Sequence, residues 1–313
     1  MTRKILIDGD PGIDEALAIT MALFDPRLEV VAITACAGIV EADRSGQNLL
    51  SLIESLDPPK RPRLAVGSDP EGAPTGDWRS LHGEDGLGNT QLPPVGRHHA
   101  VASEKLIAEQ LRTYAGRITC LTTGPLTSIA KVFQKDPALQ DAVDRLVVCA
   151  GSLDGIGDVT AVAEFNAHFD PGSAAAVFRS STTKSLVPLH TSRQLAFGWE
   201  LMERLPGKWT RAGRILHPMA THFFRAARHS LGVESFPMPA ITGLLAILHP
   251  ELLRSAEVSV EIELEGEKTR GMTWVDRRIW SPQGKELEVL SLADPEGARD
   301  AVFALLDQAG QAT

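Results

Sequence analysis

Short apolar segments alternate with amphipathic ones along nearly the whole chain. The first apolar segment is 4–7, and a helical pattern follows at 14–24, where small and apolar residues share one face. Residues 29–35 are rich in β-branched side chains and predict a second strand. By the same criteria we expect further strands at 63–66, 118–121, 145–149 and 185–189, and further helices at 43–54, 103–114, 126–133, 170–179, 213–230, 242–248 and 298–307.

This alternation predicts an α/β fold with a mostly parallel central sheet flanked by helices, which is a Rossmann-like arrangement. Residues 258–264 and 271–275 alternate in a way typical of a small, late antiparallel element. No internal repeat or linker interrupts the pattern, so we expect 1–313 to form a single domain. Parallel sheets of this kind bind ligands beyond the carboxyl ends of their strands, so polar motifs directly after strands are candidates for function. The Gly- and Pro-rich stretch 67–96 predicts a long loop, and loops of that length are usually functional or disordered.

Composition and charge narrow the possible partners. The net charge of −9 disfavours nucleic acid and anionic membranes, because both need patches of Lys and Arg. The sequence contains no stretch of about 18 apolar residues, so we expect no transmembrane helix. The N-terminus is not followed by an apolar segment typical of a signal peptide, so we expect none. Three cysteines, Cys36, Cys120 and Cys149, lie in apolar runs and are typical of buried thiols in a reducing compartment. We therefore expect a cytoplasmic protein with a small-molecule ligand.

Four carboxylates crowd the end of the first strand and the start of the first helix. The sequence at 8–16 is Asp-Gly-Asp-Pro-Gly-Ile-Asp-Glu-Ala. Capping by Asp14 and Glu15 explains the helix start but leaves Asp8 and Asp10 at the end of a buried strand. Packed carboxylates normally need a cation or shared protons, and oxygen-rich clusters suit Ca²⁺ or Mg²⁺. We therefore favour a site for a cation or a polyol over pure capping.

Three more motifs follow predicted strands or lie in the long loop. Residues 81–88 read Leu-His-Gly-Glu-Asp-Gly-Leu-Gly, and residues 121–130 read Leu-Thr-Thr-Gly-Pro-Leu-Thr-Ser-Ile-Ala. Residues 163–166 read Ala-Glu-Phe-Asn, with Asp-Pro at 170–171. A solvated loop histidine, a Gly-Pro turn before a helix, and a helix cap are the simpler interpretations of the three. None of them explains a whole string.

Taken together, in this order and spacing, the motifs resemble those of the inosine–uridine-preferring nucleoside hydrolases. The resemblance implies that the first cluster holds Ca²⁺ and the ribose hydroxyls. Asp10 would then be a metal ligand and the base that activates water, and Asp14 would hold the ribose diol. Glu15 would be a metal ligand at a position where the family has Asp. The carbonyl of Thr123 would be a further ligand.

The same resemblance assigns the remaining candidates. His82 would lie beside the nucleobase, and Glu164 with Asn166 would hydrogen-bond the ribose. Two residues that are two apart face the same side of an extended segment, as a pair that binds a diol requires. The implied partner is a nucleoside or riboside, and family members usually form homodimers or homotetramers.

The C-terminal part departs from the family pattern. The family normally carries a His-Asp pair at the start of a late helix. In this chain the two positions are occupied by Pro239 and Ala240, and neither side chain can bind a metal or move a proton. Ile39 replaces an Asn, Asp158 replaces another Asn, and 189–192 differs as well. Because Ca²⁺ takes 6–8 oxygens, the loss at Ala240 predicts weaker calcium binding unless another acid, such as Glu234, moves in.

Three functions remain open at this stage. The first is an N-glycoside hydrolase with altered specificity, in which a good leaving group, His82, His190 or an Arg of the pair Arg225 and Arg228 replaces the missing His. The second is a catalytically inactive protein that binds a nucleoside or ribose. The third is a different hydrolase acting on a sugar phosphate held by Arg225 and Arg228, although a solvated helix face explains those arginines more simply. We place the hydrolase ahead of the binding protein.

Overall fold

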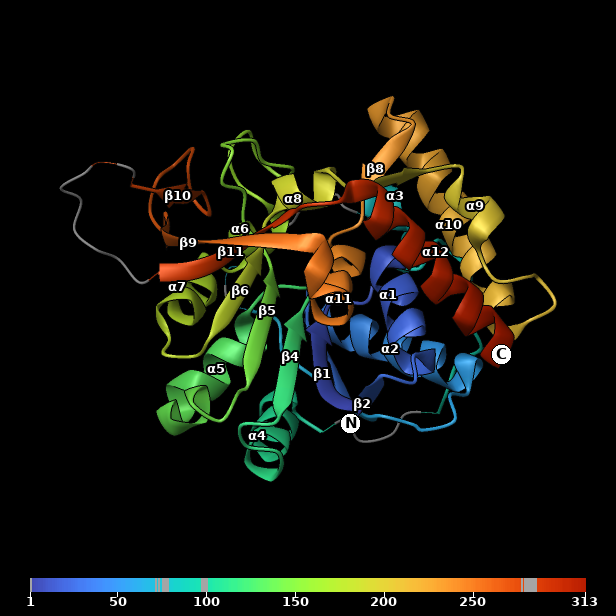
Figure 1. Ribbon diagram of the computed structural model, residues 1–313, viewed down its shortest axis with the longest axis horizontal. Helices are drawn as coiled ribbons and strands as arrows, with labels where there is room; N and C mark the ends of the chain where they lie inside the picture. Colours follow the sequence, from blue (N-terminus) through green and yellow to red (C-terminus); the bar gives the residue numbers. More distant parts are fainter. Residues whose placement is uncertain are drawn as a thin grey trace.

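The computed structural model describes residues 2–70, 72, 74, 79–96, 101–276, 278 and 286–313. Parts of the predicted loop at 67–96 therefore lie outside the described residues. Figure 1 shows a layered molecule in which the strands run through the middle and the helices pack on both faces. The predicted α/β fold is confirmed.

Within the described residues, the central sheet has nine strands in the order β10-β9-β11-β6-β5-β4-β1-β2-β3. The strands from β11 to β3 pair in parallel, whereas β9 pairs antiparallel with both β11 and β10. The antiparallel pair predicted near 258–275 is thus confirmed. The bounds are β1 Arg3–Gly9, β2 Leu28–Ala35, β3 Arg63–Val66, β4 Ile118–Thr122, β5 Arg145–Cys149, β6 Lys184–Val187, β9 Leu253–Ile262, β10 Thr273–Val275 and β11 Glu286–Leu292.

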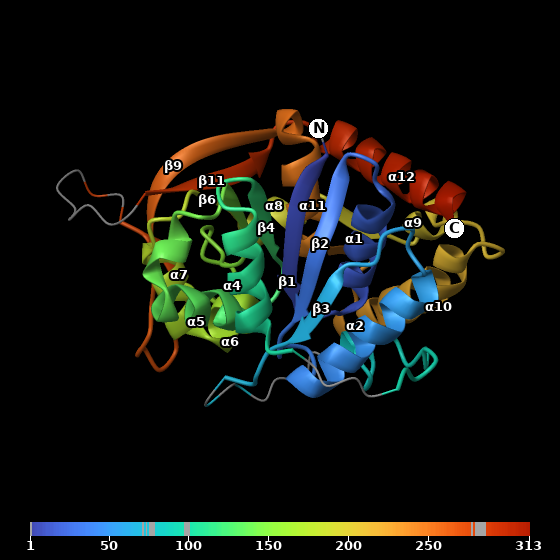
Figure 2. The same cartoon turned by 90° about the horizontal axis from the view of Figure 1, so that it is seen from below.

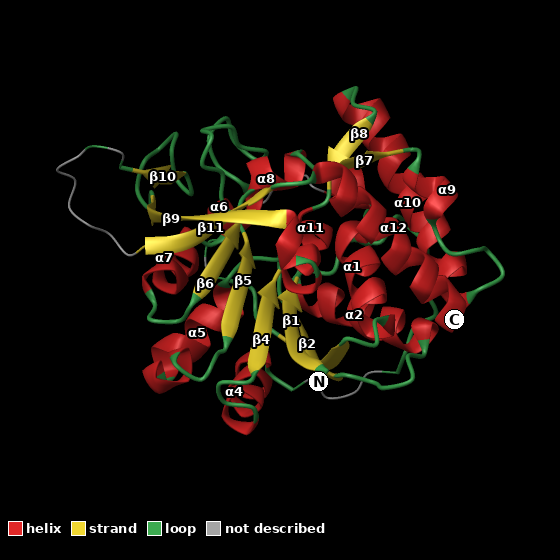
Figure 3. Cartoon of the chain, in the orientation of Figure 1, coloured by secondary structure: helices red, strands yellow, loops and turns green. Residues whose placement is uncertain are grey.

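Two groups of helices cover the two faces of the sheet, as the views in Figures 1 and 2 both show. One face carries α4 (Ser103–Thr113), α5 (Thr127–Lys135) and α7 (Pro171–Arg179). The other face carries α1 (Ile13–Phe24), α2 (Ala42–Leu56), α10 (Arg211–Leu231), α11 (Pro239–Leu248) and α12 (Pro295–Ala312). Shorter elements complete the chain: α3 Arg79–His82, η1 Pro137–Gln140, α6 Phe165–Phe169, α8 Leu189–Arg193, α9 Leu201–Arg204, η2 Pro250–Leu252 and the two-stranded sheet of β7 Ala196–Gly198 and β8 Ser235–Pro237. Figure 3 separates these helices, strands and loops by colour.

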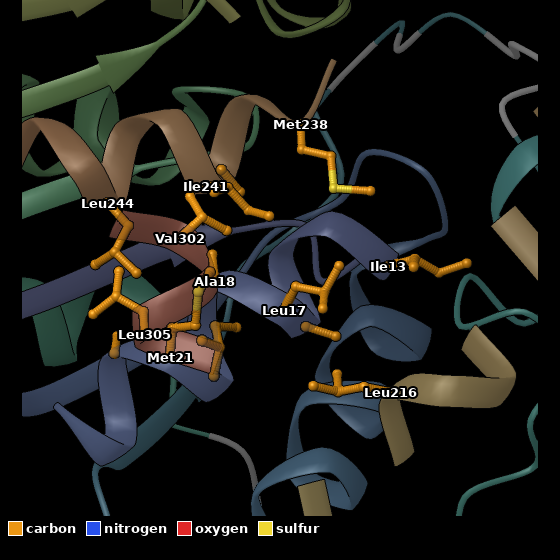
Figure 4. Packing of buried hydrophobic residues seen from close by; sticks show 14 of the residues in the cluster. Ile13, Leu17, Ala18, Met21, Leu216, Met238, Ile241, Leu244, Val302 and Leu305 are labelled. Atoms are coloured by element: carbon orange, nitrogen blue, oxygen red, sulfur yellow. The ribbon is translucent and has the colours of Figure 1, made fainter. Parts of the chain in front are cut away.

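The alternation of side chains along β1 explains why both faces are covered. Ile5 and Ile7 belong to the core under α1, α10 and α12, while Leu6 belongs to the core under α4, α5 and α7. Successive side chains of a strand point to opposite faces, so a strand that is apolar throughout needs helices on both sides. Figure 4 shows the first of these cores from close by, where α1 meets α11 and α12.

Two sequence-based expectations need correction. The strand predicted at 185–189 ends at Val187, because Pro188 has no amide hydrogen to continue the ladder and α8 begins at Leu189. The pattern analysis also missed β11, the strand that joins the parallel part of the sheet to its antiparallel edge. Its sequence alternates Glu-Leu-Glu-Val before a final apolar stretch, which is a usable signal for a half-buried strand.

Two further findings concern membrane spans and cysteines. None of the helices in the described parts of the chain is long and apolar enough to cross a membrane. All three cysteines are buried and unpaired. The parallel strands β1, β2, β4 and β5 end on the same side of the sheet, so the segments that follow them lie close together.

Candidate active site

A small cavity of about 80 Å³ lies where the central parallel strands end. Segments that follow β1, β2, β4 and β5 line one side of it, and α3, the middle of α10, β8 and the start of α11 line the other. All seven site residues predicted from the sequence line this cavity, namely Asp10, Asp14, Glu15, His82, Thr123, Glu164 and Asn166. The fold therefore brings together residues as far apart in the sequence as Asp10 and Asn166, which are separated by 156 positions. This follows from the parallel strands, whose carboxyl ends lie at one edge of the sheet.

Asp10 is almost fully buried directly after β1. One carboxylate oxygen, Oδ2, accepts a hydrogen bond from the backbone N–H of Ile39 at 2.8 Å. Gly38 allows this approach, because a Cβ atom there would collide with the Asp10 carboxylate. Burial, followed by the neighbouring charge of Glu15, raises the pKa of Asp10 well above its usual range.

Glu15 uses both of its carboxylate oxygens for hydrogen bonds within the protein. Its Oε2 accepts from the backbone N–H of Gly12 at 3.0 Å and caps α1, and its Oε1 accepts from the hydroxyl of Thr123. Burial and then the charge of Asp14 raise the pKa of Glu15 to about 8. A Glu at the third position of a helix reaches back to the cap residue, which the shorter Asp cannot do as readily. The extra methylene therefore helps start α1 while the carboxylate still faces the cavity.

Asp14 points across the cavity to the start of α11. Its Oδ2 accepts from the backbone N–H of Ala240 at 3.5 Å. Burial raises the pKa of Asp14. The segment that departs from the family pattern thus lies beside the acidic cluster, as the sequence predicts, but offers it only a backbone N–H.

Glu164 and Asn166 are both engaged with the backbone. Glu164 caps α6 and accepts from the N–H groups of Gly151, Asn166 and Ala167 at 2.6, 3.0 and 3.1 Å. Burial, against these three bonds, raises the pKa of Glu164 to about 8. Asn166 Nδ2 donates to the carbonyls of Thr123 and Cys149, while its buried Oδ1 has no hydrogen-bond partner. Oδ1 of Asn166 can therefore accept a hydrogen bond from a ligand hydroxyl, whereas both oxygens of Glu164 already accept from the backbone.

His82 is held as a neutral ring. Its Nδ1 accepts from the backbone N–H of Ile13 at 3.1 Å, which leaves the proton of the ring on Nε2. Burial and the nearby His222 lower the pKa of His82 to about 3. The ring also packs edge-on against Phe223, with 5.2 Å between centroids. Three glycines with positive φ, at 83, 86 and 88, shape the loop that follows it.

Comparison with known proteins shows to which family the chain belongs. The model of the inosine–uridine preferring nucleoside hydrolases matches residues 5–300. The chain belongs to this family. The pyrimidine-specific ribonucleoside hydrolase RihA of Salmonella choleraesuis is 31% identical over 308 residues, which cover 96% of this chain and 97% of that protein. RihA of Escherichia coli K12 is also 31% identical, over 302 residues.

Solved structures agree on the fold. A plant nucleoside hydrolase, PpNRh1, superposes with a TM-score of 0.88 at 24% identity and covers all of both chains. The purine-preferring ribonucleoside hydrolase of Gardnerella vaginalis gives a TM-score of 0.89 at 23% identity and covers 99% of this chain. These likenesses extend over the late segments as well as the motif-bearing ones, so the departures at Pro239 and Ala240 lie within a complete nucleoside hydrolase fold.

The cavity offers part of a coordination shell for the metal of such a hydrolase. The carboxylates of Asp10 and Glu15 and the carbonyl of Thr123 are oxygen donors of the kind that a hard cation prefers. Burial, followed by the charge of a neighbouring acid, raises the pKa values of both acids. Among the described residues, no group of three or more His, Cys, Asp or Glu side chains is placed to hold a metal. The three oxygen donors are thus at most part of the shell of a hard cation, and water and substrate oxygens would have to complete it.

The opposite side of the cavity is apolar, and sequence reasoning missed most of it. Phe223 of α10 and Phe236 of β8 meet with 5.4 Å between ring centroids, and Ile39 and Leu81 also line the cavity. Pro239 closes this side at the start of α11. No motif marks these residues. Phe236 could have been noticed only from its place three residues before Pro239.

Four candidates from the sequence do not reach the cavity. Glu234 is exposed and pairs with Arg228 at 3.4 Å, so it does not supply the carboxylate missing at Ala240. His190 lies outside the cavity lining, and so does Arg225, which lines a separate groove along α10. The sugar-phosphate interpretation, which needs Arg225 and Arg228 together at the site, loses its support because Arg228 is paired elsewhere.

Proposed function

We propose that this protein hydrolyses the N-glycosidic bond of a ribonucleoside or a related N-riboside, releasing ribose and the free base, with altered specificity and a weakened metal site. The observation that carries this proposal is the gathering of Asp10, Asp14, Glu15, Thr123 and Asn166 around one cavity. The relatives named above, which are ribonucleoside hydrolases, support the same reaction class.

The acidic side of the cavity suits the sugar and the attacking water. Asp10, which lines the cavity, takes the proton of the water that attacks the anomeric carbon. Asp14 accepts hydrogen bonds from the ribose diol, and the free Oδ1 of Asn166 accepts one from a further sugar hydroxyl. Negative charge beside the anomeric carbon stabilises the positive charge that develops on the sugar ring in the transition state.

Ca²⁺ is the cation that the oxygen donors suit. Asp10, Glu15 and the Thr123 carbonyl would hold it, and when bound it lowers the pKa of a coordinated water. At Ala240 the family pattern has a carboxylate, and the backbone N–H there donates to Asp14 instead. We therefore expect calcium affinity below that of a complete shell, and a larger share of ligands from water and substrate.

Sugar release from a panel of ribonucleosides tests the proposal. With excess Ca²⁺, we expect measurable ribose from at least one member of the panel and its loss in Asp10→Asn. Wild-type inactivity across the whole panel, together with measurable nucleoside binding by calorimetry, would instead support the catalytically inactive binding protein. The gap in the metal shell at Ala240 is the observation that favours this second candidate.

Further properties rest on family resemblance and composition. We propose a single nucleoside-hydrolase domain over 1–313, assembled as a homodimer or homotetramer in the cytoplasm. The buried, unpaired cysteines agree with a reducing compartment. Sedimentation analysis of the purified chain tests the oligomeric state.

A further inference from the structure

A groove on the surface along α10 is separate from the cavity of the active site. It has a volume of about 890 Å³ and is lined by one face of α10, by Ser80 of α3 and by Lys208 of the segment before α10. Sites for small molecules typically have volumes of about 300–1,000 Å³. The groove and the active-site cavity share no lining residue, so the proposed hydrolase reaction does not account for the groove.

The charged side chains that line the groove are all basic. Six basic or titratable residues belong to the lining, namely Lys208, Arg214, His217, His222, Arg225 and His229. No Asp or Glu in the described part of the chain lines the groove. The whole chain has 40 acidic residues against 31 Lys and Arg, so this concentration of positive charge runs against the composition. A surface hollow of one sign attracts a ligand of the opposite sign.

The permanent cations of the groove have no acidic partner. Within the described ranges of the chain, the side chains of Lys208, Arg214 and Arg225 form no ion pair and no hydrogen bond. Arg228 of the same helix lies outside the lining and does pair, with Glu234 at 3.4 Å. A solvated surface would explain each exposed cation singly, but it does not explain why the three unpaired ones meet in one groove.

The backbone that carries Lys208 is fixed opposite the helix. Nε2 of His217 donates to the carbonyl of Pro206 at 3.0 Å, which ties the segment before α10 to the second turn of the helix. At the first turn, Gly213 lets the two come close, because a Cβ atom there would collide with the carbonyl oxygens of Pro206 and Gly207. The groove therefore has two walls of defined geometry, and each wall carries at least one cation.

The spacing of the two arginines indicates an elongated anion. Arg214 and Arg225 are eleven residues apart, which is about three turns, so they lie on one face of α10 and ~16 Å apart along its axis. A guanidinium group matches the oxygens of a phosphate with two parallel hydrogen bonds. A single phosphate is too small to bind both arginines in this way, whereas a chain of linked phosphates carries charge along its whole length.

Uncharged polar groups lie between the two arginines. Thr221 lines the groove, and its hydroxyl can donate to an anion. His222 lines the groove as well, and its buried Nε2 has no hydrogen-bond partner among the described residues. Buried polar atoms normally have a partner, so this ring nitrogen is a further position where a ligand oxygen or a water would be accommodated.

Two larger anions fit the groove less well. Proteins that bind single-stranded nucleic acid stack bases on aromatic side chains, and no Phe, Tyr or Trp of the described residues lines the groove. An acidic protein segment would need apolar anchors, and the apolar side chains of the lining are only Pro218 and Ala226. A long polyanion would also extend beyond the groove over a surface that is acidic overall.

We propose that the groove along α10 binds a short chain of linked phosphates. The long side chains of Arg214 and Arg225 reach toward the chain from its two ends, and Lys208 approaches it from the opposite wall. Inorganic oligophosphates and the phosphate tail of a nucleoside triphosphate share this chemistry. The site is independent of the proposed hydrolase function, because none of its residues belongs to the active-site cavity.

Calorimetric titration of the full chain with tripolyphosphate, in buffer free of divalent cations, tests the inference. We expect the wild type to bind, and Kd to rise at least ~10-fold in Arg214→Ala and in Arg225→Ala, because each variant loses charge-assisted hydrogen bonds. Arg228→Ala is the matched control, since it removes the same charge from the same helix outside the groove. At physiological ionic strength its Kd should stay within about twofold of the wild type.

Two results of this titration would overturn the inference. The first is no binding of tripolyphosphate by the wild type at millimolar concentration. The second is an equal loss of affinity in all three variants, which would indicate attraction by net charge alone. All three arginines are exposed, so the variants should melt at the wild-type temperature.

Further probes identify the ligand within this class. We expect inorganic phosphate to bind at least ~10-fold more weakly than tripolyphosphate, because it cannot engage both arginines. ATP that binds more tightly than tripolyphosphate, and depends equally on Arg214 and Arg225, would assign the site to a nucleotide, whereas weaker binding of ATP would assign it to an inorganic oligophosphate. Equal affinity for phosphate and tripolyphosphate would overturn the elongated site. Tighter binding of oligouridylate or of an oligoglutamate peptide would overturn the assignment to a phosphate chain, in favour of a nucleic acid or an acidic protein.

Discussion

The two sides of the cavity are built in different ways. The acidic side comes from the ends of parallel strands and the turns that follow them, and its side chains also hold the backbone: Asp10 binds Ile39, Glu15 caps α1, and Glu164 caps α6. The apolar side comes from Phe223 in the middle of α10, Phe236 in β8 and Pro239 at the start of α11, and the two phenylalanine rings pack on one another. Phe223 and Ala240 are buried in the hydrophobic core, so changes on either side affect folding, but only on the acidic side do the same side chains both bond the backbone and face the cavity.

Asp14→Asn should give the largest effect and tests whether the acidic side holds the sugar. We expect kcat/KM for ribosides to fall by about 100-fold, since the charged hydrogen bonds to the diol weaken. A 2′-deoxyriboside lacks half of the diol and should lose much less. An equal loss with both substrates would show that Asp14 does not read the diol.

Ala240→Asp tests whether the apolar side limits the metal. Because the backbone N–H of Ala240 already faces Asp14, a carboxylate there should reach the cluster. We expect Ca²⁺ affinity, measured by calorimetry, to rise at least ~10-fold, and the melting temperature without Ca²⁺ to fall because another acid is buried. Ala240→Asn serves as the control, because Asn has the same shape as Asp but carries no charge. Unchanged affinity in both variants would place the metal away from α11.

His82→Asn should have a smaller effect and sharpens the contrast between the two sides. Asn can still accept from Ile13, so we expect a loss of only about 1 kcal/mol of stability from the contact with Phe223. Because the pKa of His82 is lowered to about 3, the ring is neutral throughout pH 5–7. The pH profile of kcat/KM over that range should therefore keep its shape. Disappearance of a limb near pH 6 would mean that His82 titrates during catalysis.

Asp8 is predicted to affect stability alone, because it does not line the cavity. Burial raises its pKa from 3.8 to about 7, partly offset by the hydroxyl of Thr34. Between these values the folded state holds a proton that the unfolded state has lost, so stability should fall as pH rises from 4 to 7, by at most ~1.4 kcal/mol per pH unit. Asp8→Asn should remove this part of the slope in thermal denaturation. Asp300→Asn, exposed on α12, should leave the slope as in the wild type, and an equal change in both variants would point to net charge instead.

The sequence predicted the acidic side better than the apolar side, for physical reasons. Carboxylates after strands and before helices form a contiguous motif, so Asp10, Asp14 and Glu15 could be found from local spacing. The lining of the base side depends on how α10 and α11 pack over the sheet, and Phe223 there has the same local pattern as any core residue. The double role of Glu15 and the paired state of Glu234 with Arg228 also required coordinates, because both depend on side-chain direction.

The dependence of rate on the departing base tests the central claim most directly. We would measure kcat for a series of N-ribosylated pyridines whose ring nitrogens differ in pKa. Without a proton donor on the apolar side, the full change in charge falls on the leaving nitrogen. We therefore expect log kcat to decrease steeply as the pKa of the ring nitrogen rises, with a slope of about −1. A slope close to zero, with chemistry shown to be rate-limiting by single-turnover measurements, would mean that the protein assists the leaving base and would contradict the division of the cavity described above.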